Sequence, residues 1–244
     1  IVIFIFGIVI GSFLNVCIYR LPLHESIITA PSHCMTCGRK LRWYDMVPVF
    51  SWIVLGGKCR NCKSKISVQY PIIEALNGIL YVLVCAVNGL TWVSLLYCLM
   101  VSALLTLSLI DWRTYEIPFG INVFLFLIGI AATALERGNL LSHLIGAVCV
   151  SAFLEILFLL SGGRAIGGGD IKLMAVCGLI LGWKQIILAF LLGCIIGSVV
   201  HTIRIKVSSA GHMLAMGPYL SAGIFLAALW GNAWISWYLS LLGL

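Results

Sequence analysis

The sequence predicts an all-α polytopic membrane protein with about eight transmembrane helices. Of its 244 residues, 62% are hydrophobic and only 9% are charged, and the mean hydropathy is +1.13. A soluble domain carries about 25% charged residues, so this composition excludes a soluble globular enzyme and a disordered chain. The net charge of +7 is too unevenly placed along the chain to form a nucleic-acid-binding face.

Apolar segments of about 20 residues have the length that crosses a bilayer. The first, residues 1–18, has no basic stretch before it and no small-residue cleavage site after it, so we interpret it as a transmembrane helix and not a signal peptide. Residues 75–110 carry no charge and would form one helix of roughly 54 Å. That length exceeds one crossing. Because Asn88-Gly89 is a turn signal, the run divides into two helices.

The later segments follow the same logic, with two irregularities. Residues 171–182 are short for a crossing. Residues 213–244 are uncharged and long, with a break expected at Gly231-Asn232. The eight expected helices are residues 1–18, 70–87, 91–110, 118–135, 140–160, 171–182, 185–203 and 213–244.

Basic residues orient these helices, because Lys and Arg gather on the cytoplasmic side of a membrane. The polar loop of residues 19–68 holds eight of the fifteen basic residues, which places it in the cytoplasm. Of the seven remaining basic residues, five then fall on the cytoplasmic side of the membrane and two on the opposite side. The five are Arg113, Arg164, Lys172, Arg204 and Lys206, and the two are Arg137 and Lys184. This orientation puts Asp111 and Asp170 at the cytoplasmic membrane face.

Two Cys-x-x-Cys pairs lie in the polar loop. Cys34 and Cys37 form the first pair, Cys59 and Cys62 form the second, and 21 residues separate them. This spacing is typical of a tetrahedral structural zinc site. Two disulfides and a redox site are the alternatives. Cytoplasmic thiols stay reduced, and a redox site needs only one pair, so the sequence favours zinc.

Asp111 and Asp170 are the acidic residues that the sequence singles out, because a carboxylate at a membrane edge is costly and often functional. Structural roles are open as well. Asp111 can pair with Arg113 at a helix end, and Asp170 can cap the helix that follows it. Their shared depth favours function. Two neighbouring carboxylates share a proton, so that one acts as base on a water while the other donates to a carbonyl oxygen.

A glycine run precedes Asp170. Gly167, Gly168 and Gly169 give a backbone more flexible than a helix cap needs, and an extended peptide is able to pair with it. No Gly-Lys-Ser/Thr follows, which excludes a phosphate loop. Lys172, two residues after Asp170, is expected to stabilise the ionised form of that aspartate or to bind lipid phosphate.

The expected domains are a first transmembrane helix at 1–18, a cytoplasmic zinc-binding domain at 19–68 and a multi-helix membrane protease core at 69–244. The paired acids predict an aspartic endopeptidase. A non-catalytic zinc-bearing membrane scaffold or a transporter is the alternative. Transport favours charges along a midplane pathway, and these spans are almost free of charge.

The motifs resemble those of the type IV prepilin peptidase family, and their order matches from end to end. Phe119 departs from the family pattern, which has Asp there, and residues 212–217 lack a Pro-Phe before Gly-Pro. The resemblance rests on Gly11-Ser12-Phe13-Leu14-Asn15, both Cys-x-x-Cys pairs, Tyr70-Pro71-Ile72-Ile73-Glu74, Asp111 with Ile117-Pro118, Gly167-Gly168-Gly169-Asp170-Ile171-Lys172, and Gly217-Pro218-Tyr219-Leu220.

The resemblance implies a bifunctional enzyme of the bacterial inner membrane, with Asp111 and Asp170 as its catalytic aspartates. Members of the family cut a short basic leader from prepilins or pseudopilins at the cytoplasmic face. They then methylate the new N-terminal amine with S-adenosylmethionine. The expected partners are these substrates and the lipid bilayer. No nucleotide fingerprint marks the residues of the methyl-donor site.

Overall fold

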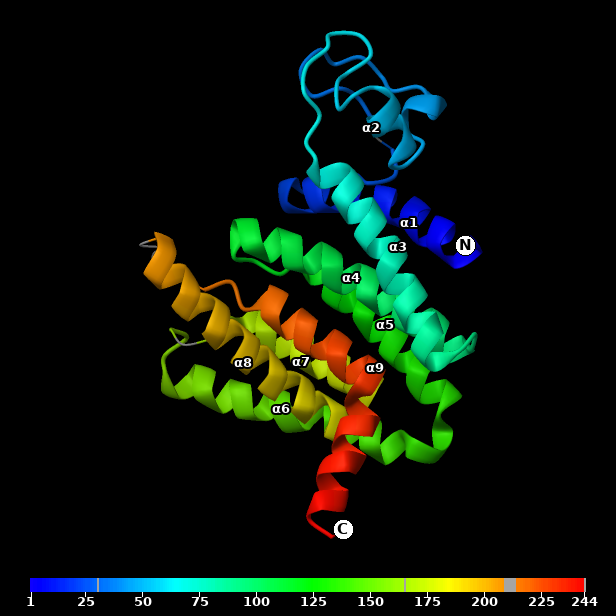
Figure 1. The fold of residues 1–244 in the computed structure, drawn as a ribbon. Coiled ribbons are helices and arrows are strands. Elements are labelled where there is room, and N and C mark those ends of the chain that lie inside the picture. Colours follow the sequence, from blue (N-terminus) through cyan, green and yellow to red (C-terminus); the bar gives the residue numbers. More distant parts are fainter. Residues whose placement is uncertain (30, 165, 209–213, 244) are drawn as a thin grey trace. The chain divides into compact units, whose positions relative to one another are not determined.

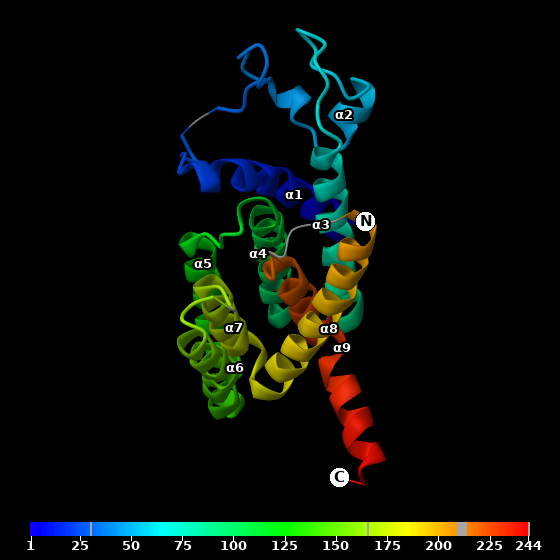
Figure 2. The same cartoon turned by 90° about the vertical axis from the view of Figure 1, so that its left-hand side faces the viewer.

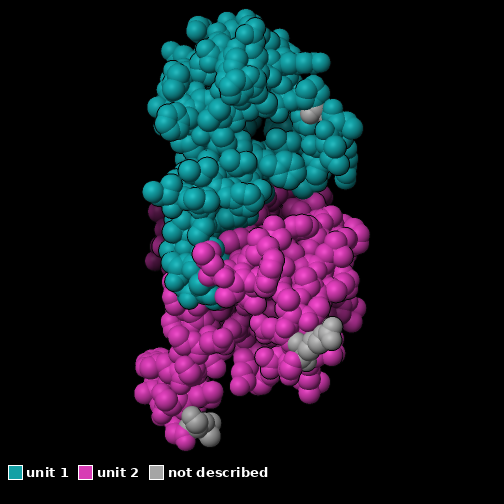
Figure 3. Space-filling model, turned by 90° about the vertical axis from the view of Figure 1, so that its right-hand side faces the viewer, with its two compact units in different colours: residues 1–89 teal, residues 90–244 magenta. Residues whose placement is uncertain are grey.

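The computed structural model describes residues 1–29, 31–164, 166–208 and 214–243. Over these residues the chain is helical, and its only extended pairings are two isolated β-bridges. The chain forms two compact units, Ile1–Gly89 and Leu90–Leu244 (Figure 3). The all-α membrane fold predicted from the sequence is confirmed.

The first unit is built on two helices that cross at glycines (Figure 1). A Cβ on Gly7 would lie 2.7 Å from the Cα of Gly78, and a Cβ on Gly11 would lie 2.7 Å from the Cα of Glu74. The Asn77 side chain also forms a hydrogen bond between the two helices, donating to the Gly7 carbonyl at 2.8 Å. Such small-residue crossings are typical of membrane helices. The two helices are α1 (Val2–Arg20) and α3 (Gln69–Asn88).

The polar loop between α1 and α3 lies at the end where α3 begins (Figures 1 and 2). It carries one short helix, α2 (Phe50–Val54), and two 3-10 turns, η1 (Leu21–Leu23) and η2 (Trp43–Asp45). Among the described residues of the loop, Cys59 has the one buried hydrophobic side chain. The loop therefore has no hydrophobic core of its own to hold its shape.

Helices that alternate in direction form the second unit (Figure 2). Because a connection returns the chain after each helix, the ends of α4, α6 and α8 lie at the same end of the unit as the starts of α5, α7 and α9. Asp111, Asp170 and Gly217 all belong to this end. The helices are α4 (Trp92–Thr114), α5 (Phe119–Leu135), α6 (Leu140–Leu160), α7 (Gly168–Leu181), α8 (Trp183–Ser208) and α9 (Gly217–Leu241), with η3 (Arg137–Asn139) between α5 and α6.

Glycines also bring the helices of the second unit into close contact. A Cβ on Gly178 of α7 would overlap the carbonyl oxygen of Gly146 on α6. A Cβ on Gly223 of α9 would overlap the carbonyl oxygen of Ala189 on α8. A hydrogen bond joins α6 and α7 beside the first of these contacts, with His143 Nδ1 3.0 Å from the Leu179 carbonyl oxygen. These contacts fix α7 and α9, the two helices whose first turns carry Asp170 and Gly217.

A helix occupies each of the eight positions expected from the sequence, but six of the described helices are long and apolar enough to cross a membrane. They are α1, α3, α4, α6, α8 and α9. Helix α5 has 17 residues and α7 has 14, which makes α7 about 21 Å long. The count of eight spans is therefore not confirmed. Protein covers much of α7, whose Leu173, Met174 and Cys177 are fully buried.

The break expected at Gly231-Asn232 is wrong, because α9 runs without interruption from Gly217 to Leu241. The polar side chain of Asn232 has a partner within the unit, since its Oδ1 accepts from Gln185 Nε2 at 2.9 Å. The turn at Asn88-Gly89 is confirmed, with α3 ending at Asn88. Met213 and Leu244, the limits of the last expected helix, lie outside the described residues.

Candidate active site and metal centre

Asp111 lies in the last turn of α4 with its side chain buried. Its Oδ2 accepts a hydrogen bond from the backbone N–H of Gly217 at 2.8 Å. Gly217 is the first residue of α9. The first N–H groups of a helix lack partners within the helix and lie at the positive end of its dipole. The start of α9 therefore fixes the position of the Asp111 carboxylate.

Asp170 is the third residue of α7, and Gly167 occupies the N-cap position. The Asp170 N–H donates to the Gly167 carbonyl at 3.1 Å. The alternative that Asp170 is itself the N-cap is therefore wrong. Gly169 lets α7 start close to the loop after α4, because a Cβ there would lie 3.0 Å from the Cβ of Ile117.

The two aspartates are neighbours at one end of the second unit. Asp111 lies in the last turn of α4 and Asp170 in the first turn of α7, and both turns belong to this end of the unit. Two close carboxylates away from bulk water do not both ionise, and they share one proton. The pair is therefore able to supply a base and an acid to one reacting group.

The other residues expected at this site lie around Asp170. No described atom comes within 4 Å of a Cβ built on Gly168, so the backbone there is open. Lys172 is exposed, and its Nζ lies 5.7 Å from the centroid of the Phe119 ring, which is within the range of a cation–π contact. The open glycine backbone thus lies directly before the aspartate in the chain.

Gly217 is a site residue that sequence reasoning did not identify as the partner of Asp111. A Cβ on Gly217 would lie 2.7 Å from Asp111 Oδ2 and 3.1 Å from Leu107 Cδ2. A side chain at this position is therefore incompatible with the observed hydrogen bond. The only signal in the sequence was the Gly217-Pro218 block, and nothing in that block points to residue 111.

We expect Gly217→Ala to slow peptide cleavage by about 10- to 100-fold, because a hydrogen bond to a charged group contributes about 1.5–3 kcal/mol. The new methyl group displaces the Asp111 carboxylate from its donor. The measurement is the initial rate of leader removal from a prepilin, the reaction that the resemblance implies. Gly120→Ala is the matched control, since a Cβ there meets no described atom within 4 Å. Equal cleavage rates for the two variants would show that Gly217 does not contribute to the site.

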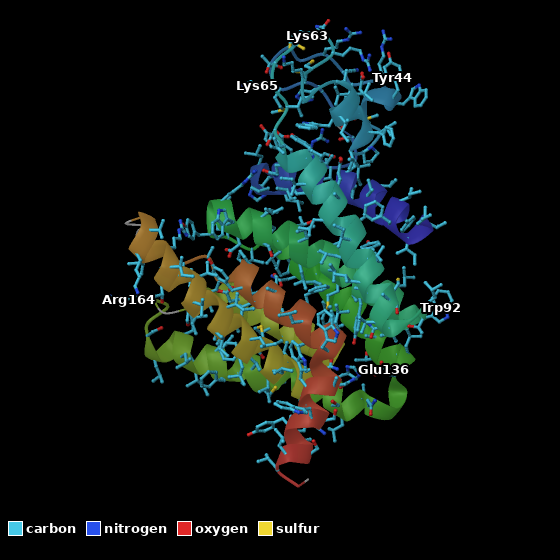
Figure 4. The ribbon with its side chains drawn as sticks, viewed as in Figure 1. Tyr44, Lys63, Lys65, Trp92, Glu136 and Arg164 are labelled. Carbon is cyan, nitrogen blue, oxygen red and sulfur yellow. The ribbon has the colours of Figure 1, made fainter. Side chains whose placement is uncertain are left out.

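The four loop cysteines lie on two matching turns. The Gly38 N–H donates to the Cys34 carbonyl at 2.8 Å, and the Lys63 N–H donates to the Cys59 carbonyl at 3.0 Å. The residue after each pair has a positive φ, +69° at Gly38 and +58° at Lys63. Each turn thus repeats the other, and each presents two thiols to the same point. In Figure 4 this part of the loop is found by the labelled residues Lys63 and Lys65.

The sulfur atoms of this cluster fit a zinc ion. All four Sγ atoms lie within 4.8 Å of one another, and the Sγ atoms of Cys34 and Cys62 are 3.8 Å apart. Tetrahedral zinc with Zn–S distances of about 2.3 Å requires sulfur separations of about 3.8 Å. Hydrogen bonds from the backbone N–H groups of Cys37 and Thr36 lower the pKa of the Cys34 thiol to about 6, which supplies a thiolate at neutral pH.

We expect zinc removal to unfold residues 19–68 and to leave the helices of the membrane units folded, because the loop has almost no buried hydrophobic side chains. Metal analysis of the purified protein should give one zinc per chain. Limited proteolysis after chelation should then cut within the loop and not within the helices. A protein with four free thiols, no zinc and an uncut loop would contradict this account of the cluster.

By fold the chain is a helical multi-pass membrane protein, and two aspartates lie at one end of its second unit. The model of the "Bacterial Peptidase A24 N-terminal domain" matches residues 5–88, and that of the "Type IV leader peptidase family" matches residues 98–202. These matches follow the two compact units. The chain belongs to the type IV leader peptidase family.

Three relatives named prepilin leader peptidase/N-methyltransferase illustrate the likeness. The protein of Bacillus subtilis is 32% identical over 98% of each chain. That of Pseudomonas aeruginosa is 31% identical over 97% of this chain and 92% of its own length. That of Myxococcus xanthus is 35% identical over 81% of this chain and 60% of its own length. No solved structure matches the chain.

Proposed function

We propose that the chain is a membrane aspartic endopeptidase that cleaves the basic leader from type IV prepilin-like proteins and N-methylates the new N-terminus. The observation that carries the proposal is that Asp111 and Asp170 lie at the same end of the second unit, where the Gly217 N–H holds the Asp111 carboxylate. The names of the relatives, which join peptidase and methyltransferase, support both reactions.

In the cleavage step, Asp111 starts ionised and Asp170 starts protonated, because the Gly217 N–H stabilises the charge on Asp111. Asp111 takes a proton from a water as the water oxygen attacks the scissile carbonyl carbon. Asp170 gives its proton to the carbonyl oxygen. The C–N bond then breaks: Asp111 passes its proton to the leaving nitrogen, and Asp170 recovers one from a hydroxyl of the intermediate. Both carboxyls return to their starting states.

Substrate recognition is assigned to the glycine backbone before Asp170. Gly168 is open, and an extended peptide is able to form backbone hydrogen bonds along Gly167, Gly168 and Gly169. This pairing would hold the scissile bond beside the carboxylate that follows directly in the chain. Lys172 supports the same segment from the outer face of α7, where it contacts Phe119.

We place this site at the cytoplasmic face of the bacterial inner membrane. Arg164 and Glu136 lie at opposite ends of the second unit, as Figure 4 shows. The end with Arg164 also carries the two aspartates, Arg113 and Arg204. Because basic residues gather on the cytoplasmic side, this end faces the cytoplasm. The partners are prepilin or pseudopilin substrates and the surrounding lipid.

Two further groups belong to the proposal. One zinc ion bound by Cys34, Cys37, Cys59 and Cys62 cross-links the two turns of the loop and has a structural role. S-adenosylmethionine is the methyl donor. The functional division at 1–18, 19–68 and 69–244, with the zinc-binding domain in the middle segment, stays a prediction.

Incubation of the purified protein with a prepilin tests the proposed function. We expect the leader to be released by cleavage at one peptide bond, and the new N-terminus to gain one methyl group when S-adenosylmethionine is present. Mass spectrometry of the product measures both changes. Recovery of intact, unmethylated prepilin with a zinc-loaded protein would reject the proposal.

A further inference from the structure

A cavity of about 610 Å³ lies within the first unit, between the cysteine loop and the ends of α1 and α3. Pockets that bind small molecules have about this size and combine aromatic walls with a few convergent polar groups. Trp52 and Tyr70 line the cavity, and the Trp52 ring is held by its Nε1–H bond to the Ile66 carbonyl at 3.3 Å. The proposed peptidase reaction uses none of these residues.

Two buried acceptors lie at the floor of the cavity, on the crossing helices. The side chains of Glu74 and Asn15 are 6% and 5% exposed, and both line the cavity. The Asn15 Nδ2 donates to the Tyr70 carbonyl at 3.2 Å, whereas its Oδ1 has no hydrogen-bond partner among the described residues. An unpaired buried acceptor beside a buried carboxylate indicates a ligand that brings N–H donors or positive charge.

The loop is bent to hold Glu74 in place. The Val49 N–H donates to Glu74 Oε2 at 2.7 Å, and Val49 has a φ of +61°. A positive φ is a strained conformation for a β-branched residue and concentrates at functional sites. Ser12, on α1, lines the same cavity as Glu74. A loop residue 25 positions away thus helps to position the carboxylate.

We propose that this cavity is the site of methyl transfer, with Glu74 as the group that takes the proton from the pilin amine. The inference rests on the methyltransferase half of the proposed function. The aromatic wall suits the adenine of the donor, and the basic residues Arg39 and Lys40, which also line the cavity, suit its carboxylate. Glu74 and the free Oδ1 of Asn15 suit the substrate ammonium.

The reaction balances with these residues. A new N-terminal amine is largely protonated at neutral pH, since its pKa lies near 8. Glu74 takes one proton, which frees the lone pair of the nitrogen. That pair forms the N–C bond to the methyl group, and the C–S bond breaks with its electrons going to the sulfur, which becomes a neutral thioether. The product is a methylated ammonium, and Glu74 returns its proton to water.

Donor binding tests the position of the site without reference to activity. Equilibrium dialysis of the zinc-loaded protein with labelled S-adenosylmethionine should show one donor bound per chain. Ser51→Trp fills the cavity from α2 and should abolish this binding, whereas Ser240→Trp, on the exposed face of α9, should not. Binding by the Ser51→Trp variant at the wild-type level would overturn the inference.

Glu74→Gln tests the role of the carboxylate. We expect methyl transfer to a pre-cut pilin to fall about 100-fold or more, as for loss of a general base. Donor binding, zinc content and prepilin cleavage should stay unchanged, which a merely structural role of Glu74 would not allow. Glu155→Gln is the matched control, because Glu155 is exposed on α6 outside the cavity.

The outcomes separate the inference from the proposed function. If the wild-type protein and the Glu74→Gln variant methylate equally well, the inference is wrong and the proposed function stands. Wild-type protein that cleaves prepilin but neither binds the donor nor methylates overturns the inference together with the methyltransferase half of the proposal. Loss of transfer with retained donor binding and cleavage in the Glu74→Gln variant supports both.

Discussion

Asp111→Asn and Asp170→Asn are each expected to reduce prepilin cleavage by on the order of 10²- to 10⁴-fold, the contribution of general acid–base catalysis. Asn matches Asp in size and accepts a hydrogen bond, so the bond from the Gly217 N–H to residue 111 has a substitute partner. An amide does not relay a proton, however, and the pair then lacks either its base or its acid. Asp→Ala at either position should fail as well.

The measurement is the rate of leader release by each variant at equal zinc content. Glu155→Gln is the control for loss of one acidic group, since this side chain is exposed on α6. Helix content and thermal unfolding establish that each variant is folded. Near-normal turnover in either Asn variant would remove that aspartate from the catalytic pair.

Cys34→Ser and Cys59→Ser are expected to weaken methylation far more than cleavage. Each removes one of the four zinc ligands, and the loop depends on the metal because its own core is small. The aspartate pair belongs to the second unit, whose helices pack through glycine contacts that do not involve the metal. Assays of the two reactions on the same preparation make the comparison. Equal losses in both reactions would show that cleavage also needs the folded loop.

Features with a local signal in the sequence were predictable. Each expected helix is present because a long apolar segment favours a membrane helix over other structures. The Asn88-Gly89 pair is itself a turn signal, so the turn there was predictable too. The cysteine cluster was predictable for the same reason, since each Cys-x-x-Cys pair forms its own turn. The left-handed conformation of Lys63 was not predictable, because glycine is the residue that usually indicates this backbone geometry.

Contacts between residues that are distant in sequence were not predictable. The hydrogen bond that fixes Asp111 joins it to a residue 106 positions away. The continuity of α9 involves Gln185, which lies 47 positions before Asn232. The bond between Val49 and Glu74 spans 25 positions and depends on a strained backbone in the loop. Periodicity and motif spacing carry no information on such pairs, although the conformations of the site depend on them.

Methyl transfer by Asp111→Ala to two substrates tests most directly the claim that the two reactions use different parts of the chain. The amine to be methylated does not exist until the peptide bond is cut. The variant should therefore leave a full-length prepilin unmethylated, and it should transfer labelled methyl from S-adenosylmethionine to a pre-cut pilin at the wild-type rate. Failure of the folded, zinc-loaded variant to methylate the pre-cut pilin would contradict the separation of the two sites.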